Sequence, residues 1–308
     1  MEKTILSFYC DDTNPYHAPP EAFKTFLDFA SAEGIAGESS VIFGYNWSEH
    51  GLTSRPTTSA QSAYLEQVQR AFTCGIDSQF ELMTHAGLFD FAQVNIPAGA
   101  IHEGVWLFEP AVTVQAYETY FNSILEEGER LGIRFTGLTQ PGCSCDACNR
   151  RYQELHAAGI TAPNPNVWQA LLNLAIAGKF RGPSVPCFFG GALEQGSARM
   201  MAGDGLHGVY DLPPNTEDRF GLWLNARDRV NVDYYITADG QSGRIVDLVH
   251  AHATYCLFYA HWQGLNPANG VGWYAFTQMV QRVQKNLYQD ILWMRPSEYT
   301  NRLLGHTE

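Results

Sequence analysis

Apolar residues along this chain recur at two different spacings, and their alternation predicts strands followed by helices. Leu6–Cys10 is a short apolar run typical of a buried strand, and Glu21–Gly34 carries apolar residues at helical spacing before a terminating glycine. Further strands are predicted at Val41–Gly44, Phe80–Thr84, Ile133–Leu138, Val185–Phe189, Val230–Ile236 and Thr254–Ala260. Further helices are predicted at Ser59–Ala71, Val112–Leu131, Asn149–Ala158, Asn166–Ala177, Gly243–Ala251 and Tyr274–Trp293.

This order predicts the α/β class, with a parallel sheet covered by helices. The chain has 308 residues, with no internal repeat and no low-complexity linker. We therefore expect one domain over residues 1–308: a (β/α) barrel, irregular or incomplete, with seven to eight parallel strands and long loop insertions. A doubly wound open sheet is the alternative.

The charge balance narrows the range of partners. The chain has 32 acidic and 19 basic residues, a net charge of −13, which disfavours nucleic acids and anionic membranes. No apolar run is long enough to span a bilayer, and no secretory signal precedes the first strand. These features predict a cytoplasmic protein, although a chain whose signal had been removed would look the same. The oligomeric state is left open.

Polar side chains gather directly after the predicted strands. They are Asp11, Asp12, Asn46, Glu49, His50, His85, Thr139, Gln140, Asp239, His261 and Trp262. In a parallel barrel the carboxyl ends of the strands share one rim, so residues far apart in sequence would meet there.

The adjacent Asp11 and Asp12 indicate a metal site. Two neighbouring carboxylates raise each other's proton affinity unless their roles are separated, and a metal ion separates them. One acid would then bind the metal while the other serves as a base. Aspartate and histidine together suit a divalent ion, with Zn²⁺ as the first choice. Such an ion lowers the pKa of water and supports hydrolysis of esters and amides.

At these motifs the chain resembles the polysaccharide deacetylases of carbohydrate esterase family 4, the NodB-homology domain. Tyr9-Cys10-Asp11-Asp12 is similar to the family's first motif, a strand that ends in an aspartate pair. Glu81-Leu82-Met83-Thr84-His85 supplies the first histidine of the second motif, and Phe89 stands where the second would be. Thr139-Gln140-Pro141-Gly142 keeps only the proline of the third motif, and Leu257–His261 fits the last.

The resemblance implies a metal-dependent hydrolase that removes an acyl group from a carbohydrate. It implies Asp11 as the base, His261 as the acid, and Asp12 and His85 as metal ligands. His102 is the candidate for the ligand that Phe89 does not provide.

Aromatic and polar residues near the strand ends are candidate contacts for a sugar. Trp47, Trp106 and Trp262 are predicted to line the cleft, because sugars pack their C–H faces on rings. Core packing is the alternative for each of them. The remaining predicted contacts are His50, Gln140 and Asp239.

Three of the seven cysteines, Cys143, Cys145 and Cys148, lie within six residues at the start of a predicted helix. With His156 on that helix they could hold a structural Zn²⁺. The alternatives are inert thiols in a turn, or one disulfide if the protein is exported. Cys10 is expected to be a small core residue.

Two other functions fit the same sequence. The first is a glycoside-active barrel, in which Asp11 or Asp12 would act with Glu49, Glu109 or Asp239. The second is a catalytically inactive barrel that binds carbohydrate.

Overall fold

The computed structural model describes residues 3–15, 19–42, 58–82, 103–141, 146–189, 198–221 and 230–306. Its strands are β1 (Thr4–Asp11), β2 (Gly37–Val41), β3 (Ile76–Phe80), β4 (Gly137–Thr139), β5 (Ser184–Phe188), β6 (Arg199–Gly203), β7 (Gly208–Asp211), β8 (Tyr255–His261) and β9 (Ile291–Trp293). Its α-helices are α1 (Pro20–Glu33), α2 (Ser59–Ala71), α3 (Glu103–Trp106), α4 (Val114–Arg130), α5 (Asp146–Ala157), α6 (Pro165–Ile176), α7 (Val232–Tyr235), α8 (Arg244–His250), α9 (Trp262–Leu265), α10 (Val271–Leu287) and α11 (Pro296–Leu303).

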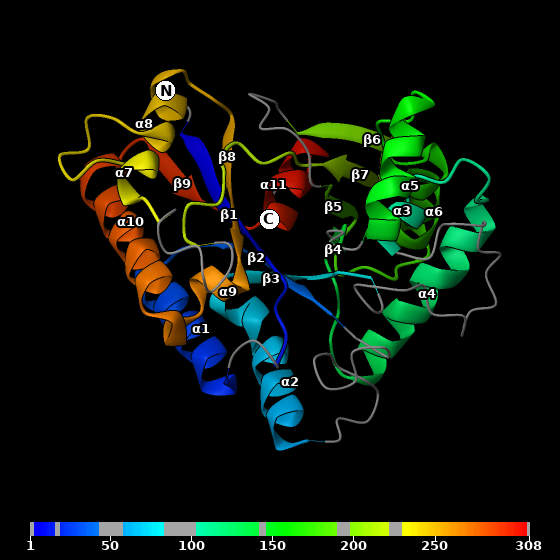
Figure 1. The fold of residues 1–308 in the computed structure, drawn as a ribbon, viewed down its shortest axis with the longest axis horizontal. Coiled ribbons are helices and arrows are strands. Elements are labelled where there is room, and N and C mark those ends of the chain that lie inside the picture. Colours follow the sequence, from blue (N-terminus) through cyan, green and yellow to red (C-terminus); the bar gives the residue numbers. More distant parts are fainter. Residues whose placement is uncertain are drawn as a thin grey trace.

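The strands form one curled, mostly parallel sheet in the order β6-β7-β5-β4-β3-β2-β1-β8. Among the described strands only β6 pairs antiparallel, with β7. Strand β1 pairs with β8 along one edge. Along the other edge of β1, its first half pairs with β9 and its second half pairs with β2. Figure 1 shows α1 and α10 at the left of the view and α4 and α6 at its right, around the outside of the curled sheet. The α/β class and parallel strands are therefore confirmed, whereas a complete barrel is not.

The sheet separates two apolar clusters of different size. Along β1, Leu6 and Phe8 belong to the large cluster that includes the helix side chains, whereas Ile5 and Tyr9 belong to a small one. The small cluster also contains Phe188 of β5 and Leu257 of β8, so it fills the concave side of the curled sheet. Tyr9 stacks on Phe188 there.

The free edge of β8 is satisfied by side chains instead of a strand ladder. Asn215 pairs with Leu257 through its own backbone N–H and its side-chain oxygen. Thr216 accepts the backbone N–H of Tyr259, and Asp218 accepts that of His261. The segment 215–218 therefore covers an edge whose unpaired N–H groups would otherwise be costly to bury.

Several predicted elements differ from those observed. The segment Val230–Ile236 contains the short helix α7 and no strand. The helix predicted at Tyr274–Trp293 ends at Leu287, and its last residues form β9. The β6–β7 hairpin was not predicted, and β2 and β3 each begin four residues before the predicted strands.

Gly137 shows how closely the central strands pack. A Cβ atom at this position would lie 1.9 Å from the carbonyl oxygen of Pro186 on β5. We predict that Gly137→Ala lowers the free energy of unfolding by about 3 kcal/mol or more, because backbone cannot yield as a flexible side chain does. Urea denaturation checks this, with Gly182→Ala as control, since its Cβ would meet only ordinary contacts of 3.5 Å. Equal stability of the two variants would contradict the packing described here.

Asp77 of β3 ties the sheet to the start of α11. Its carboxylate accepts hydrogen bonds from the backbone N–H and the hydroxyl of Ser297, each 2.8 Å long. Burial nevertheless raises the pKa of Asp77 to about 6, against the lowering effect of these hydrogen bonds. The folded protein therefore holds this proton more tightly than the unfolded chain does.

The raised pKa makes Asp77 a source of pH-dependent stability. Its contribution is fully present below about pH 4 and is lost as pH rises through about 6, by about 3 kcal/mol in total. We predict that Asp77→Asn, which cannot ionise, gains about this much relative to wild type between pH 4 and pH 7. Urea denaturation at several pH values measures it, with the exposed Asp290→Asn as control. A pH-independent difference between Asp77→Asn and wild type would refute it.

No helix among the described residues is long and apolar enough to cross a membrane.

Candidate metal and acid–base site

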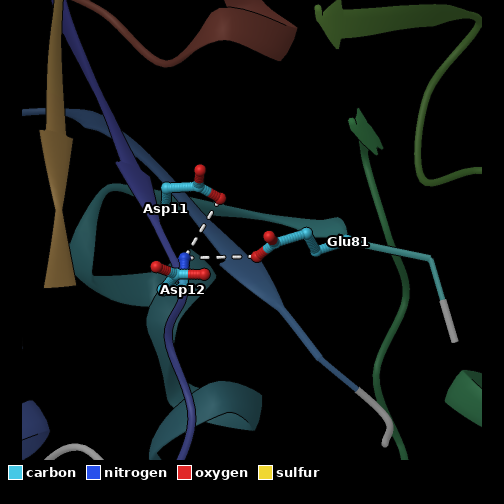
Figure 2. Close-up of side chains that lie close together, drawn as sticks. All are labelled: Asp11, Asp12 and Glu81. Atoms are coloured by element: carbon cyan, nitrogen blue, oxygen red, sulfur yellow. Dashed lines mark hydrogen bonds between the residues drawn. The ribbon is translucent and has the colours of Figure 1, made fainter. Parts of the chain in front are cut away.

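Three buried carboxylates converge at the carboxyl ends of β1 and β3. Asp11, Asp12 and Glu81 each offer an oxygen within 4.8 Å of the others'. Asp11 ends β1 and Asp12 follows it, whereas Glu81 is the first residue after β3 (Figure 2). Strand β2 lies between β1 and β3, so the carboxyl ends of β1 and β3 flank the carboxyl end of β2. The rim position expected for the aspartate pair is thus observed.

The backbone around these acids is unusual. Asp12 has a φ of 64°, and Leu82, which follows Glu81, has a φ of 51°. Left-handed backbone is uncommon outside glycine, and such positions cluster at functional sites. The backbone N–H of Asp12 donates to both Asp11 Oδ1, at 3.1 Å, and Glu81 Oε2, at 3.2 Å. The turn after β1 therefore holds the carboxylates of two strands together.

Hydroxyl and amide groups hold the three carboxylates in place. Ser40 of β2 donates to Glu81 at 2.6 Å, and the Tyr9 hydroxyl donates to Asp11 at 3.1 Å. The Gln263 amide donates to Asp12 at 2.9 Å. These groups are neutral, so they orient the acids without cancelling their charge.

Glu38 of β2 adds another acid near this cluster. Burial raises the pKa of the Glu38 carboxyl well above its usual value, and the charges of Asp11 and Asp77 raise it further. The nearby acids contribute negative charge at this end of the sheet, and a bound cation would be stabilised by it.

His261 stands beside Asp11, because β8 and β1 pair in register at these two residues. Its Nε2 lies 3.9 Å from Asp11 Oδ2 and 2.9 Å from the Tyr259 hydroxyl, which itself donates to Asp11 at 3.3 Å. Its Nδ1 lies 2.8 Å from Asp218 Oδ2. A protonated imidazole ring therefore has an acceptor for each of its two N–H groups.

Two opposing effects set the pKa of His261. Burial is the larger single effect and lowers it, but the hydrogen bond to Asp218 and the charges of Asp11 and Asp218 together outweigh burial. The pKa of His261 is therefore raised. An imidazole with a raised pKa keeps its proton to a higher pH than a free histidine does, and it can donate that proton as a general acid must.

Oxygen donors that converge in this way can hold a divalent metal ion. Three carboxylates suit oxygen-binding cations such as Mg²⁺ and Mn²⁺, and Zn²⁺ also accepts carboxylate ligands. The histidines predicted as further ligands, His85 and His102, lie outside the described residues. So do Trp47 and His50, and the side chains of Cys143, Cys145 and Cys148.

Several predicted substrate contacts are placed elsewhere. Trp106 and Trp262 are fully buried: Trp106 packs on Tyr117 and Tyr120, and Trp262 packs on Phe23 and Phe26. For these two tryptophans the prediction of a cleft contact is wrong, and core packing, the alternative, is what is observed.

The polar candidates also have other partners. Asp239 lies in an exposed turn with Thr237 and Gln241, and the strand expected before it is not formed. Gln140 follows β4 and donates to the Tyr152 hydroxyl at 2.6 Å. Glu109, a candidate for glycoside chemistry, is buried and bound through both oxygens by Arg151. Cys10 is a buried thiol, as expected, and burial raises its pKa.

Sequence reasoning missed two residues of the site, Glu81 and Asp218. Glu81 was visible in the second motif, but the predicted strand ran past it to Thr84. A strand boundary at Phe80 would have placed Glu81 on the rim with Asp11. Asp218 lies in Leu212–Asp218, which contains two prolines and reads as an ordinary loop. No local pattern marks its pairing with a histidine 43 residues later.

Comparison with known proteins adds no family assignment. A scan against models of protein families and a search of curated proteins each found no match. The likeness to the polysaccharide deacetylases therefore rests on the motifs themselves.

Proposed function

We propose that this protein is a metal-dependent hydrolase that removes an acyl group from a carbohydrate. The observation that carries the proposal is the convergence of Asp11, Asp12 and Glu81 beside a histidine whose pKa is raised. A carboxylate cluster alone would serve many purposes. A cluster that adjoins a positioned proton donor has the parts that hydrolysis of an ester or amide requires.

Each residue has a role that follows from its surroundings. Asp12 and Glu81 would hold the divalent ion, with His85 and His102 as the further ligands that the motifs predict. When bound, the ion would stabilise the negative charge that develops on the acyl oxygen. The nature of the ion is part of the proposal: Zn²⁺ if the histidines bind it, and Mg²⁺ or Mn²⁺ if oxygen ligands dominate.

Asp11 and His261 would divide the proton transfers. Asp11 is oriented by Tyr9 and Tyr259 and would accept the proton of the attacking water. His261, held by Asp218, would give its proton to the departing alcohol or amine of the sugar. The proposed base and acid are neighbours across the β1–β8 pair, at the same end of the sheet.

Acetate release tests the proposal directly. Purified protein would be assayed on acetylated xylan and on chitooligosaccharides, with and without a chelator, and acetate would be measured. We expect release that disappears on chelation and returns with one divalent metal. Release of reducing sugar without acetate, insensitive to chelator, would favour the glycoside-active barrel instead, since a carboxylate pair needs no metal. Sugar affinity without turnover would favour the binding barrel.

A further inference from the structure

A cavity of about 610 Å³ lies at the opposite end of the sheet from the three carboxylates. Ile5, which lines it, is the second residue of β1, and Thr254, which also lines it, immediately precedes β8. The same two strands end at Asp11 and His261. The volume is within the range of pockets that hold small-molecule ligands.

The charge of this cavity is opposite to that of the molecule. Lys3, His252 and Arg302 line it, and no acidic residue does so among the described residues. The whole chain carries a net charge of −13 and only 19 lysines and arginines. Basic side chains are scarce in this protein, yet several of them lie around one cavity. Solubility alone does not account for this placement.

The positive charge of the cavity is not cancelled by described neighbours. Lys3 Nζ donates to the backbone carbonyl of Tyr288, which is neutral, and retains two further N–H groups. Glu298 lies one helical turn before Arg302, but its carboxylate is bound by Arg295. Arg302 has no ion pair with any residue in the described part of the chain.

The rest of the wall is apolar. Ile5, Ala253, Tyr299 and Leu303 line the cavity, and Tyr299 is buried while Leu303 is half exposed. A ligand that matched the wall would combine an anionic group for Lys3 and Arg302 with an apolar or aromatic body. A simple inorganic anion would leave the apolar wall uncovered, and a neutral apolar molecule would leave the cations without a partner.

We propose that this cavity is a second binding site, which takes a small molecule with a phosphate or carboxylate group on an apolar body. The inference is independent of the proposed hydrolase activity. The amino ends of parallel strands are the face that, in barrels, serves stability and not chemistry. We therefore expect a ligand at this end of the sheet to stabilise the folded protein by binding to it, without being chemically changed.

Phenyl phosphate is the probe that tests the site, with phenylacetate to compare phosphate and carboxylate. Titration calorimetry would use full-length protein in chelator, so that no metal at the carboxylate cluster recruits the phosphate. We expect phenyl phosphate to bind saturably at one site. Inorganic phosphate and phenol should each bind at least about tenfold more weakly than phenyl phosphate. A thermal shift that grows with ligand concentration should accompany it.

Two variants locate the binding. Arg302→Gln and Lys3→Gln should each weaken phenyl phosphate binding by about tenfold or more, since each removes a charge-assisted hydrogen bond. Arg150→Gln, an exposed arginine on α5, is the matched control and should leave the affinity unchanged. Equal affinity in Arg302→Gln, Lys3→Gln and Arg150→Gln would overturn the proposal. So would the absence of saturable binding by both probes in wild type.

Discussion

Asp12→Asn is expected to abolish metal binding and, with it, hydrolysis. Asparagine has nearly the shape of aspartate and tolerates the left-handed backbone at this position, where φ is 64°. It lacks the charge that attracts the ion. Even partners outside the ligand shell change metal affinity by about tenfold to a hundredfold, so loss of a ligand should cost more than about a hundredfold. Elemental analysis of protein purified without added metal measures the stoichiometry.

Folding and metal binding can be separated in the same experiment. Without metal, the three carboxylates repel one another, so removing one charge should leave the apo-protein as stable as wild type or more stable. Glu81→Gln should behave like Asp12→Asn, because both residues belong to the cluster. Asp239→Asn, an exposed turn residue, is the control and should keep the metal. Full metal stoichiometry in Asp12→Asn and Glu81→Gln would place the ion elsewhere.

The sequence predicted β1 and β8 from their apolar residues, and these two strands frame the site. Strand β8 is apolar from Tyr255 to Ala260, and in β1 only Ser7 interrupts the apolar residues between Thr4 and Asp11. The residues that end the two strands, Asp11 and His261, are paired neighbours in the sheet. The prediction failed where the concave side of the sheet is polar. Strand β2 reads Gly-Glu-Ser-Ser-Val and β3 reads Ile-Asp-Ser-Gln-Phe, so apolar content placed both strands too late.

One physical cause explains both the misplaced prediction of β2 and β3 and the presence of a polar site at their ends. Side chains that alternate toward the concave side include Glu38, Ser40 and Asp77, and such polar residues are buried there at an energetic cost. A sheet whose purpose was stability alone would fill this space with apolar residues, as β5 and β8 partly do. Strands β2 and β3, whose polar residues made the hydrophobicity-based prediction fail, are therefore the strands that bring Glu81 close to Asp11.

Long-range pairing was the other limit of sequence reasoning. The contact between Asp218 and His261 joins an irregular segment to a strand edge, and neither residue's neighbours reveal it. The buried tryptophans show the reverse error, because an aromatic residue next to a catalytic candidate in sequence can point into the core. Trp262 directly follows His261, yet it starts α9 and packs against α1 on the helix side of the sheet.

Asp218→Asn is expected to lower the hydrolytic rate and to move its pH dependence. The Asp218 carboxylate accepts both the backbone N–H and the Nδ1–H of His261, and it is the first of the groups that raise the pKa of this imidazole. Without its charge, burial prevails and the pKa of His261 falls. At neutral pH less of the imidazole then carries the proton that the leaving group needs. We expect a loss in kcat on the order of a hundredfold, within the range for a general acid.

The sign of the pH shift distinguishes this role from a structural one. In wild type, activity should fall as pH rises through the raised pKa of His261, which sets the basic limb of the profile. In Asp218→Asn that limb should move to lower pH, and His261→Ala should remove it. Stability follows the same sign: the contribution of His261 is complete below about pH 6.5 and is lost as pH rises through its folded pKa. Glu217→Gln, the exposed neighbouring acid, is the matched control and should shift neither limb. An unmoved basic limb in Asp218→Asn, with kcat reduced, would mean that Asp218 only holds the segment 215–218 against β8.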